Sequence, residues 1–135
     1  MPTPTEVVEQ FCAAFAAKDV DTISSLLGDD VVYHNVGMAP AVGKEASLAM
    51  IQGFLDMAES MSFEIHRIAA NGDSVLTERT DTFTINGAQA PIPVMGTFDL
   101  QDGLIVGWRD YFDLGLTTKM MGGEDVDAAV LPVIS

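Results

Sequence analysis

Apolar positions in the first part of the chain recur with the period of an α-helix. From Thr5 to about Ala17, with Thr5 as the predicted cap, a helical repeat joins Val7, Val8, Phe11, Cys12, Ala14 and Phe15. A short helical piece is expected in "DVDTISSLLG". In "GKEASLAMIQGFLDMAES" the same spacing joins Leu48, Ile51, Phe54, Leu55 and Ala58, which predicts a long amphipathic helix.

Elsewhere the pattern has a period of two, which is typical of β-strands. In "DDVVYHNVG", Val31, Tyr33 and Asn35 alternate with the residues between them and predict a short strand. Further strands are expected at 62–70, 74–86, 92–101 and 104–114, separated by the turn signals "NGD", "NGAQAP" and "DG". Helices followed by an antiparallel meander predict an α+β fold.

The size and charge of the chain limit the possible functions. With 135 residues, 48% of them hydrophobic, the chain is expected to form one domain over 1–135. A net charge of −14 repels phosphate backbones and anionic lipids, so no nucleic-acid partner is expected. No segment has the length and composition of a membrane span or signal peptide, and the predicted location is cytoplasmic.

Few residues of this chain are suited to binding a metal. The nitrogen and sulfur ligands are His34, His66 and Cys12, which show no metal-ligand spacing, and Cys12 falls on the apolar side of its helix. We therefore expect neither a metal nor another cofactor. The tail, "LTTKMMGGEDVDAAVLPVIS", predicts a helical turn, a glycine break and an apolar end that closes a pocket or contacts a second subunit.

One carboxylate lies where an apolar residue is expected. In "GWRDYFDL" (107–114), strand alternation puts Asp110 on one face with Leu104, Val106, Trp108 and Phe112. A carboxylate on an apolar face costs several kcal/mol unless it is paired or protonated. Asp110 therefore needs a partner.

The strand "LTERTDTFTIN" offers that partner. Arg79, Asp81, Phe83 and Ile85 share a face that we expect to point inward, while the intervening threonines face solvent. Residues two apart on a strand are separated by roughly 6.5–7 Å, so Arg79 can pair with Asp81 and is placed to meet Asp110 as well.

Two carboxylates that share one arginine titrate as a coupled unit and can retain one proton near neutral pH. Such a site holds one acid and one base, and the polar ends of Tyr33 and Asn35 could hold a water beside it. A purely structural ion cluster is the alternative, but buried ion networks add little stability. We favour the functional interpretation.

Three motifs resemble the limonene-1,2-epoxide hydrolase family: "YHN" at 33–35, "ERTD" at 78–81 and "GWRDYFDL" at 107–114. The resemblance extends over roughly residues 5 to 115. It implies a cone-like α+β fold, in which a curved, mostly antiparallel mixed sheet is wrapped by N-terminal helices, as in ketosteroid isomerase and the SnoaL-like polyketide cyclases. It also implies a homodimer.

The resemblance implies a role for each residue of the site. Asp110 would be the general base and Asp81 the general acid, with Arg79 bridging them and Tyr33 and Asn35 holding a water with Asp110. The expected reaction adds water to a small apolar epoxide in one step, without a covalent intermediate.

Two other functions remain open at this stage. A proton-transfer isomerase of the ketosteroid isomerase kind would use an aspartate base and an oxyanion hole, which differs from an arginine between two aspartates. A binding module would hold a small apolar molecule without turnover. A larger α/β-hydrolase with an aspartate nucleophile is disfavoured by the short chain and by the lack of a nucleophile elbow.

Overall fold

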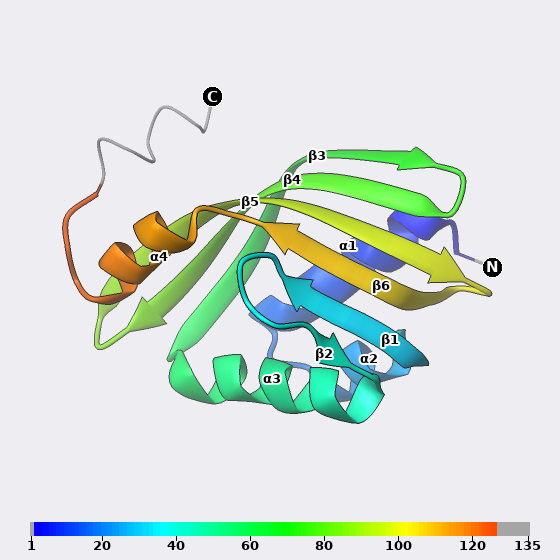
Figure 1. Ribbon diagram of the computed structural model, residues 1–135, viewed down its shortest axis with the longest axis horizontal. Helices are drawn as coiled ribbons and strands as arrows, with labels where there is room; N and C mark the ends of the chain where they lie inside the picture. The colour runs from blue at the N-terminus through cyan, green and yellow to red at the C-terminus, as the bar shows by residue number, and fades with distance from the viewer. Residues whose placement is uncertain (1, 127–135) are drawn as a thin grey trace.

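The computed structural model describes residues 2–126 as four helices and one six-stranded sheet (Figure 1). The helices are α1 (Pro4–Ala16), α2 (Val20–Ser25), α3 (Lys44–Met57) and α4 (Leu114–Met121). The strands are β1 (Leu27–Asn35), β2 (Ala41–Val42), β3 (Ser60–Asn71), β4 (Ser74–Ile85), β5 (Ala88–Gln101) and β6 (Leu104–Tyr111). The predicted α+β class is confirmed.

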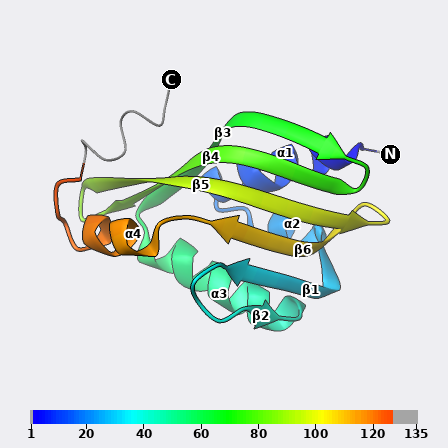
Figure 2. The ribbon, with the colours of Figure 1, turned by 45° about the horizontal axis from the view of Figure 1, so that its top comes forward.

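The sheet has the strand order β2-β1-β6-β5-β4-β3 (Figure 2). Strands β3 to β6 form the predicted meander, in which each strand pairs antiparallel with the next. Strand β1, from the N-terminal part of the chain, pairs parallel with β6. This pairing places Tyr33 beside Trp108 and Asn35 beside Asp110. The sheet is therefore mixed and mostly antiparallel, as expected.

Helices α1 and α3 cover one face of the curved sheet, with α1 crossing behind β3 to β6 and α3 running along β1 and β2 (Figures 1 and 2). Aromatic rings of α1 and of the sheet pack against one another. Trp108 of β6 is fully buried, and Phe11 of α1 meets it edge-on at a centroid distance of 5.0 Å. Cys12 is also in this core, as predicted, and burial raises the pKa of its thiol to about 12. A thiol of that acidity is a packing residue rather than a nucleophile.

The first helix begins earlier than its apolar pattern predicts, and Thr5 is not its cap. Thr3 is the cap: its hydroxyl accepts from the Glu6 N–H, while the Glu6 carboxylate accepts from the Thr3 N–H. Pro4 takes the first helical position, where no N–H is needed. The Thr-x-x-Glu capping box therefore decides the start of α1.

The predicted alternation in the last strand was wrong at its start. A register irregularity between Asp99 and Leu100 of β5 shifts the pairing, so Ile105 is buried and Leu104 is exposed. Trp108 and Asp110 still point inward because the irregularity precedes them. The strand ends at Tyr111, and the chain enters α4 three residues later.

The threonine face of β4 is less exposed than predicted, since Thr80 is 4% exposed and its hydroxyl lies 2.7 Å from His66 Nε2. Strand β5 begins at Ala88, four residues before the predicted start. The helical turn predicted in the tail is α4, whereas the apolar end, residues 127–135, lies outside the described residues. Within residues 2–126, no helix combines the length and apolar character needed to span a membrane.

Candidate active site

Three neighbouring strands bring the predicted charged residues together. Across the sheet, Thr77 of β4 pairs with Gly96 of β5, and Gly96 pairs with Asp110 of β6. A Cβ atom on Gly96 would lie 2.2 Å from Arg79 Nη1 and 2.5 Å from Asp110 Oδ1. Because residue 96 has no side chain, Arg79 can reach across β5 from β4 to β6.

The Arg79 guanidinium uses all of its N–H donors inside the protein. Nε and Nη2 donate to the two carboxylate oxygens of Asp81 over 3.0 and 2.7 Å. Nη1 and Nη2 donate to those of Asp110 over 3.2 and 2.9 Å, and Nη1 also donates to Thr77 Oγ1 over 3.1 Å. Arg79 thus joins the two carboxylates, and no guanidinium N–H remains for a ligand.

The acid cluster is buried and held by its surroundings. Arg79, Asp81 and Asp110 are 1%, 5% and 3% exposed. The guanidinium carbon lies 5.1 Å from the ring centre of Phe63, and Trp108 Nε1 donates to Asp110 Oδ1 over 2.8 Å. These contacts fix the geometry of all three charged groups.

Burial also changes the protonation of the cluster. It raises the pKa of Asp81 to about 6, against the opposing effect of Arg79 and with a smaller raising effect of Asp110. Burial alone would lower the pKa of Arg79, but Asp110 and Asp81 together raise it well above its ordinary value. The cluster therefore combines a permanent cation with a carboxyl group that stays protonated in mildly acidic solution, up to about pH 6.

Tyr33 and Asn35 lie beside the acids, as predicted, because β1 pairs with β6 at this level. The Tyr33 hydroxyl donates to Asn35 Oδ1 over 3.4 Å, and Asn35 Nδ2 donates to the weakly accepting sulfur of Met50 over 3.7 Å. Burial, followed by the charge of Asp110, raises the pKa of Tyr33 beyond the physiological range. Tyr33 is therefore a neutral phenol that can bind a water.

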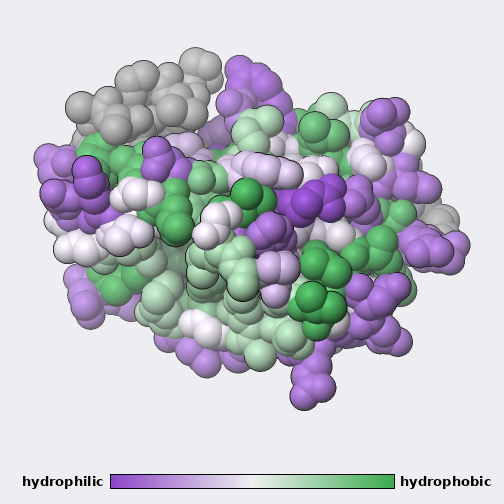
Figure 3. All heavy atoms as spheres, in the orientation of Figure 1, coloured by the Kyte–Doolittle hydropathy of each residue, from purple (hydrophilic) through white to green (hydrophobic). Residues whose placement is uncertain are grey.

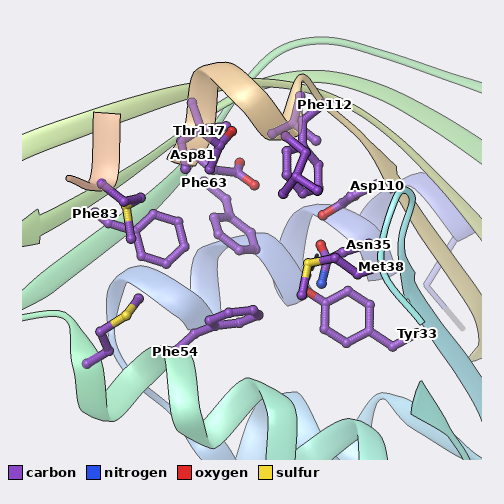
Figure 4. Close-up of a pocket in the computed structure, with 15 residues that line it drawn as sticks. Tyr33, Asn35, Met38, Phe54, Phe63, Asp81, Phe83, Asp110, Phe112 and Thr117 are labelled. Atoms are coloured by element: carbon purple, nitrogen blue, oxygen red, sulfur yellow. Dashed lines mark hydrogen bonds between the residues drawn. The ribbon is translucent and has the colours of Figure 1, made fainter. Parts of the chain in front are cut away.

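A pocket of about 140 Å³ opens above the acid cluster (Figure 4). Its polar lining residues are Tyr33, Asn35, Asp81, Asp110 and Thr117. The remainder is apolar: Met38, Phe54, Met57, Phe63, Phe83, Ile92, Val94, Phe112, Leu114 and Met121. Most of the apolar lining thus consists of Met, Leu and Phe side chains, and Figure 3 shows hydrophobic residues on the same face as α3 and α4.

Sequence reasoning placed the two acids, Arg79, Tyr33 and Asn35 but missed their supports. Thr77 shares a face with Arg79, two residues away on β4, which could have marked it as a partner. Gly96 lies inside a strand, where a glycine often marks a close approach. Thr117 lies beyond the motifs, and its hydroxyl is the one buried side-chain polar atom without a hydrogen-bond partner in residues 2–126.

A cone-like α+β protein with paired acids at the end of an apolar pocket is the class that the fold and site define. Residues 2–121 match the family described as "Limonene-1,2-epoxide hydrolase catalytic domain", and the chain belongs to that family. It is 42% identical over 109 residues to the epoxide hydrolase EphG of Mycobacterium tuberculosis, covering 79% of this chain and 71% of EphG.

Solved structures give the same family and the same fold. A structure of an M. tuberculosis limonene-epoxide-hydrolase-like epoxide hydrolase is 38% identical with a TM-score of 0.77, covering 95% of this chain and 96% of that one. A putative SnoaL-like polyketide cyclase from Shewanella denitrificans has a TM-score of 0.79 at 14% identity, covering 92% and 100%. The second match supports the fold alone.

Within the described residues, no group of three or more His, Cys, Asp and Glu side chains is placed to hold a metal ion. Among residues 2–126, the only buried acidic groups around the pocket are Asp81 and Asp110, which both contact Arg79. Paired buried acids of this kind are suited to proton transfer.

Proposed function

We propose that this protein is an epoxide hydrolase that adds water to a small apolar epoxide in one step and releases a vicinal diol. The observation that carries the proposal is the buried Asp81–Arg79–Asp110 cluster at the end of an apolar pocket. Membership of the limonene-1,2-epoxide hydrolase family supports the same activity.

The reaction assigns one proton to each aspartate. A water bound by Asp110, Tyr33 and Asn35 transfers a proton to Asp110 while its oxygen forms a bond to an epoxide carbon. The C–O bond of that carbon breaks, and Asp81 donates its proton to the departing oxygen. The pKa of Asp81, raised by burial to about 6, suits an acid that must be protonated before the reaction.

Arg79 serves this reaction without contacting the substrate. Its cation stabilises the charge on whichever aspartate is ionised, and its short contacts hold both carboxylates in place. After each turnover, Asp110 carries the proton that Asp81 has lost. Transfer of one proton from Asp110 to Asp81, directly or through water, restores the starting state.

The size of the pocket suits a small monocyclic epoxide. An engineered apolar cavity of about 150 Å³ in another protein binds benzene, and the pocket here measures about 140 Å³. Four phenylalanine side chains in its wall offer apolar contacts to a hydrocarbon ring. Limonene, cyclohexene and styrene oxides are therefore suitable test substrates.

Diol formation by the two aspartate variants tests the proposal. Asp81→Asn and Asp110→Asn are each expected to reduce kcat/KM by about 10²–10⁴, because each removes one proton-transfer group. The matched control is Asp99→Asn, since Asp99 pairs with Arg109 over 2.8 Å outside the pocket. Wild-type rates from Asp81→Asn or Asp110→Asn, with the fold intact by circular dichroism, would contradict the assignment.

The same assay separates the two other functions. A binding module would hold the epoxides without forming diol. An isomerase would convert none of them to diol and would instead rearrange a ketone substrate. The fold alone is shared with such proteins, and the arginine between two aspartates favours the hydrolase.

We also propose that the protein is a homodimer, as members of the family commonly are. The outer face of the sheet supports this proposal, because Leu76, Met95 and Tyr111 are 47%, 51% and 49% exposed there. Analytical ultracentrifugation should give twice the monomer mass, and Met95→Glu should shift the population toward monomer. A monomeric wild-type protein would contradict the proposal.

A further inference from the structure

The contacts of Arg79 do not by themselves distinguish its two aspartates. The guanidinium makes two hydrogen bonds to Asp81, over 3.0 and 2.7 Å, and two to Asp110, over 3.2 and 2.9 Å. Both carboxylates are almost completely buried and both line the pocket. A further contact must decide which carboxylate keeps the proton.

Trp108 supplies the difference between the two acids. Its indole N–H donates to Asp110 Oδ1 over 2.8 Å, whereas the side-chain hydrogen bonds that Asp81 receives within the described chain all come from Arg79. An indole N–H can only donate, so it favours an ionised carboxylate oxygen as its partner. The contact thus stabilises negative charge on Asp110 and not on Asp81.

The position of this donor is fixed by the packing of its ring. Trp108 is fully buried and stacks on Tyr33, with ring centres 3.9 Å apart and an angle of 9° between the planes. Phe98 stacks at 5.7 Å and 15°, and Phe11 packs edge-on against the same indole. Because the ring cannot turn in this cluster, its N–H points at Asp110.

We infer that Trp108 is a positioning residue that assigns the roles of the two acids: its N–H holds Asp110 as the ionised base and leaves the proton to Asp81. This inference rests on the proposed function for the meaning of the roles. It goes beyond that function by naming the group that makes the cluster asymmetric. The raised pKa of Asp81 agrees with the same assignment.

Two substitutions remove the donor and keep an aromatic ring. Trp108→Phe deletes the N–H together with part of the ring, whereas 3-benzothienylalanine at position 108 replaces N–H by sulfur in a bicyclic ring of nearly the same shape. In both proteins, the acid limb of the kcat/KM profile should move to higher pH by about one unit. The rate at the pH optimum should change much less.

Phe11→Leu is the packing control. The ring centres of Phe11 and Trp108 are 5.0 Å apart, so this variant changes the packing of the indole but leaves its N–H in place. Its acid limb should coincide with that of the wild type even if its stability falls. An unmoved acid limb in the benzothienyl protein would overturn the inference, because the N–H would then not set the position of that limb. A shift in Trp108→Phe alone would come from the changed shape of the ring.

A second readout does not depend on activity. In protein labelled with ¹³C at the aspartate carboxyl carbons, the signals of the two acids are those absent from Asp81→Asn and Asp110→Asn. At about pH 6, removal of the N–H should move the proton from Asp81 toward Asp110. An unchanged distribution of the proton would overturn the inference. If the wild type forms no diol from any epoxide, the proposed function fails, while this measurement still tests the action of Trp108 on Asp110.

Discussion

At the scale of single residues, the site depends on a carboxyl group whose acidity is set by burial. Asp81 is buried beside one cation and near a second carboxylate, and burial raises its pKa to about 6. Between pH 3.8 and about 6, Asp81 in the native protein therefore keeps a proton that it releases in the unfolded chain, where its pKa has the ordinary value of 3.8. The titration of this residue therefore makes the stability of the protein depend on pH.

The sign of that coupling gives a prediction for Asp81→Asn. As pH rises through the window between 3.8 and about 6, the native state holds more protons than the unfolded state, so the Asp81 contribution to stability is lost. The free energy of unfolding of the variant, measured relative to that of wild type, should therefore rise by about 2–3 kcal/mol as the pH is raised from 4 to 7.

Urea denaturation at pH 4, 5, 6 and 7 measures this difference. The control is Asp99→Asn: the pKa of Asp99 is lowered below 3.8, first by its hydrogen bond from Arg109, so its contribution to stability is lost only at lower pH and the difference between this variant and wild type should stay nearly constant from pH 4 to 7. A constant stability difference between Asp81→Asn and wild type across this range would show that Asp81 does not titrate there.

At the scale of elements, three adjacent strands carry the cluster. The period of β4 was enough to predict that Arg79 and Asp81 share a face, and the short turns were enough to make β4, β5 and β6 neighbours. The start of β6 could not be predicted in the same way, because an irregularity in its pairing shifts Leu104 and Ile105. Alternation alone does not show where a strand bulges.

Gly96→Ala tests the passage that β5 leaves for Arg79. A Cβ at this position would lie 2.2 Å from Arg79 Nη1, so the side chain or the strand must move. We expect a loss of about 1–3 kcal/mol in stability and a fall of about 10²-fold in kcat/KM. Chemical denaturation and diol assays measure the two effects.

The matched control is Gly53→Ala in α3, where an added Cβ would meet nothing within 4 Å. This helix substitution should be neutral or stabilise by roughly 0.5–1 kcal/mol. Equal stability and activity of Gly96→Ala and the wild type would mean that Arg79 does not need the space above β5.

Helix α4 contributes the residue with an unmet hydrogen bond. The Thr117 hydroxyl is buried without a partner, so Thr117→Val, which keeps the shape, should stabilise the protein by about 1–3 kcal/mol. Thr118→Val is the control, since the Thr118 hydroxyl is exposed and donates to the Leu114 carbonyl over 2.8 Å. A thermal melt in which Thr117→Val is less stable than Thr118→Val would contradict the account.

At the scale of the whole molecule, the site joins distant parts of the chain. The acids come from the meander of β3 to β6, whereas Tyr33 and Asn35 come from β1. Strand β1 follows the first two helices in sequence and pairs parallel with β6. Local patterns predicted each of these elements. They could not predict the parallel pairing or the indole N–H above Asp110, because both depend on contacts between segments far apart in sequence.

The same arrangement explains why the acids lie in an apolar setting. The helices and the curved sheet form a pocket lined mostly by apolar side chains, and the buried carboxyl groups of Asp81 and Asp110 also line it. In the proposed reaction, an apolar epoxide occupies this pocket while its strained ring meets the two acids and the attacking water. Exclusion of bulk water also strengthens the interactions of Arg79 with both carboxylates.

The central claim is that water, and not a carboxylate, attacks the epoxide. A single-turnover reaction with excess enzyme in ¹⁸O-labelled water tests it most directly by mass spectrometry of diol and protein. Attack by the water held at Asp110 predicts ¹⁸O in the diol of the first turnover and none in Asp81 or Asp110. Unlabelled diol from that first turnover, with ¹⁸O entering an aspartate on hydrolysis of an ester, would contradict the claim.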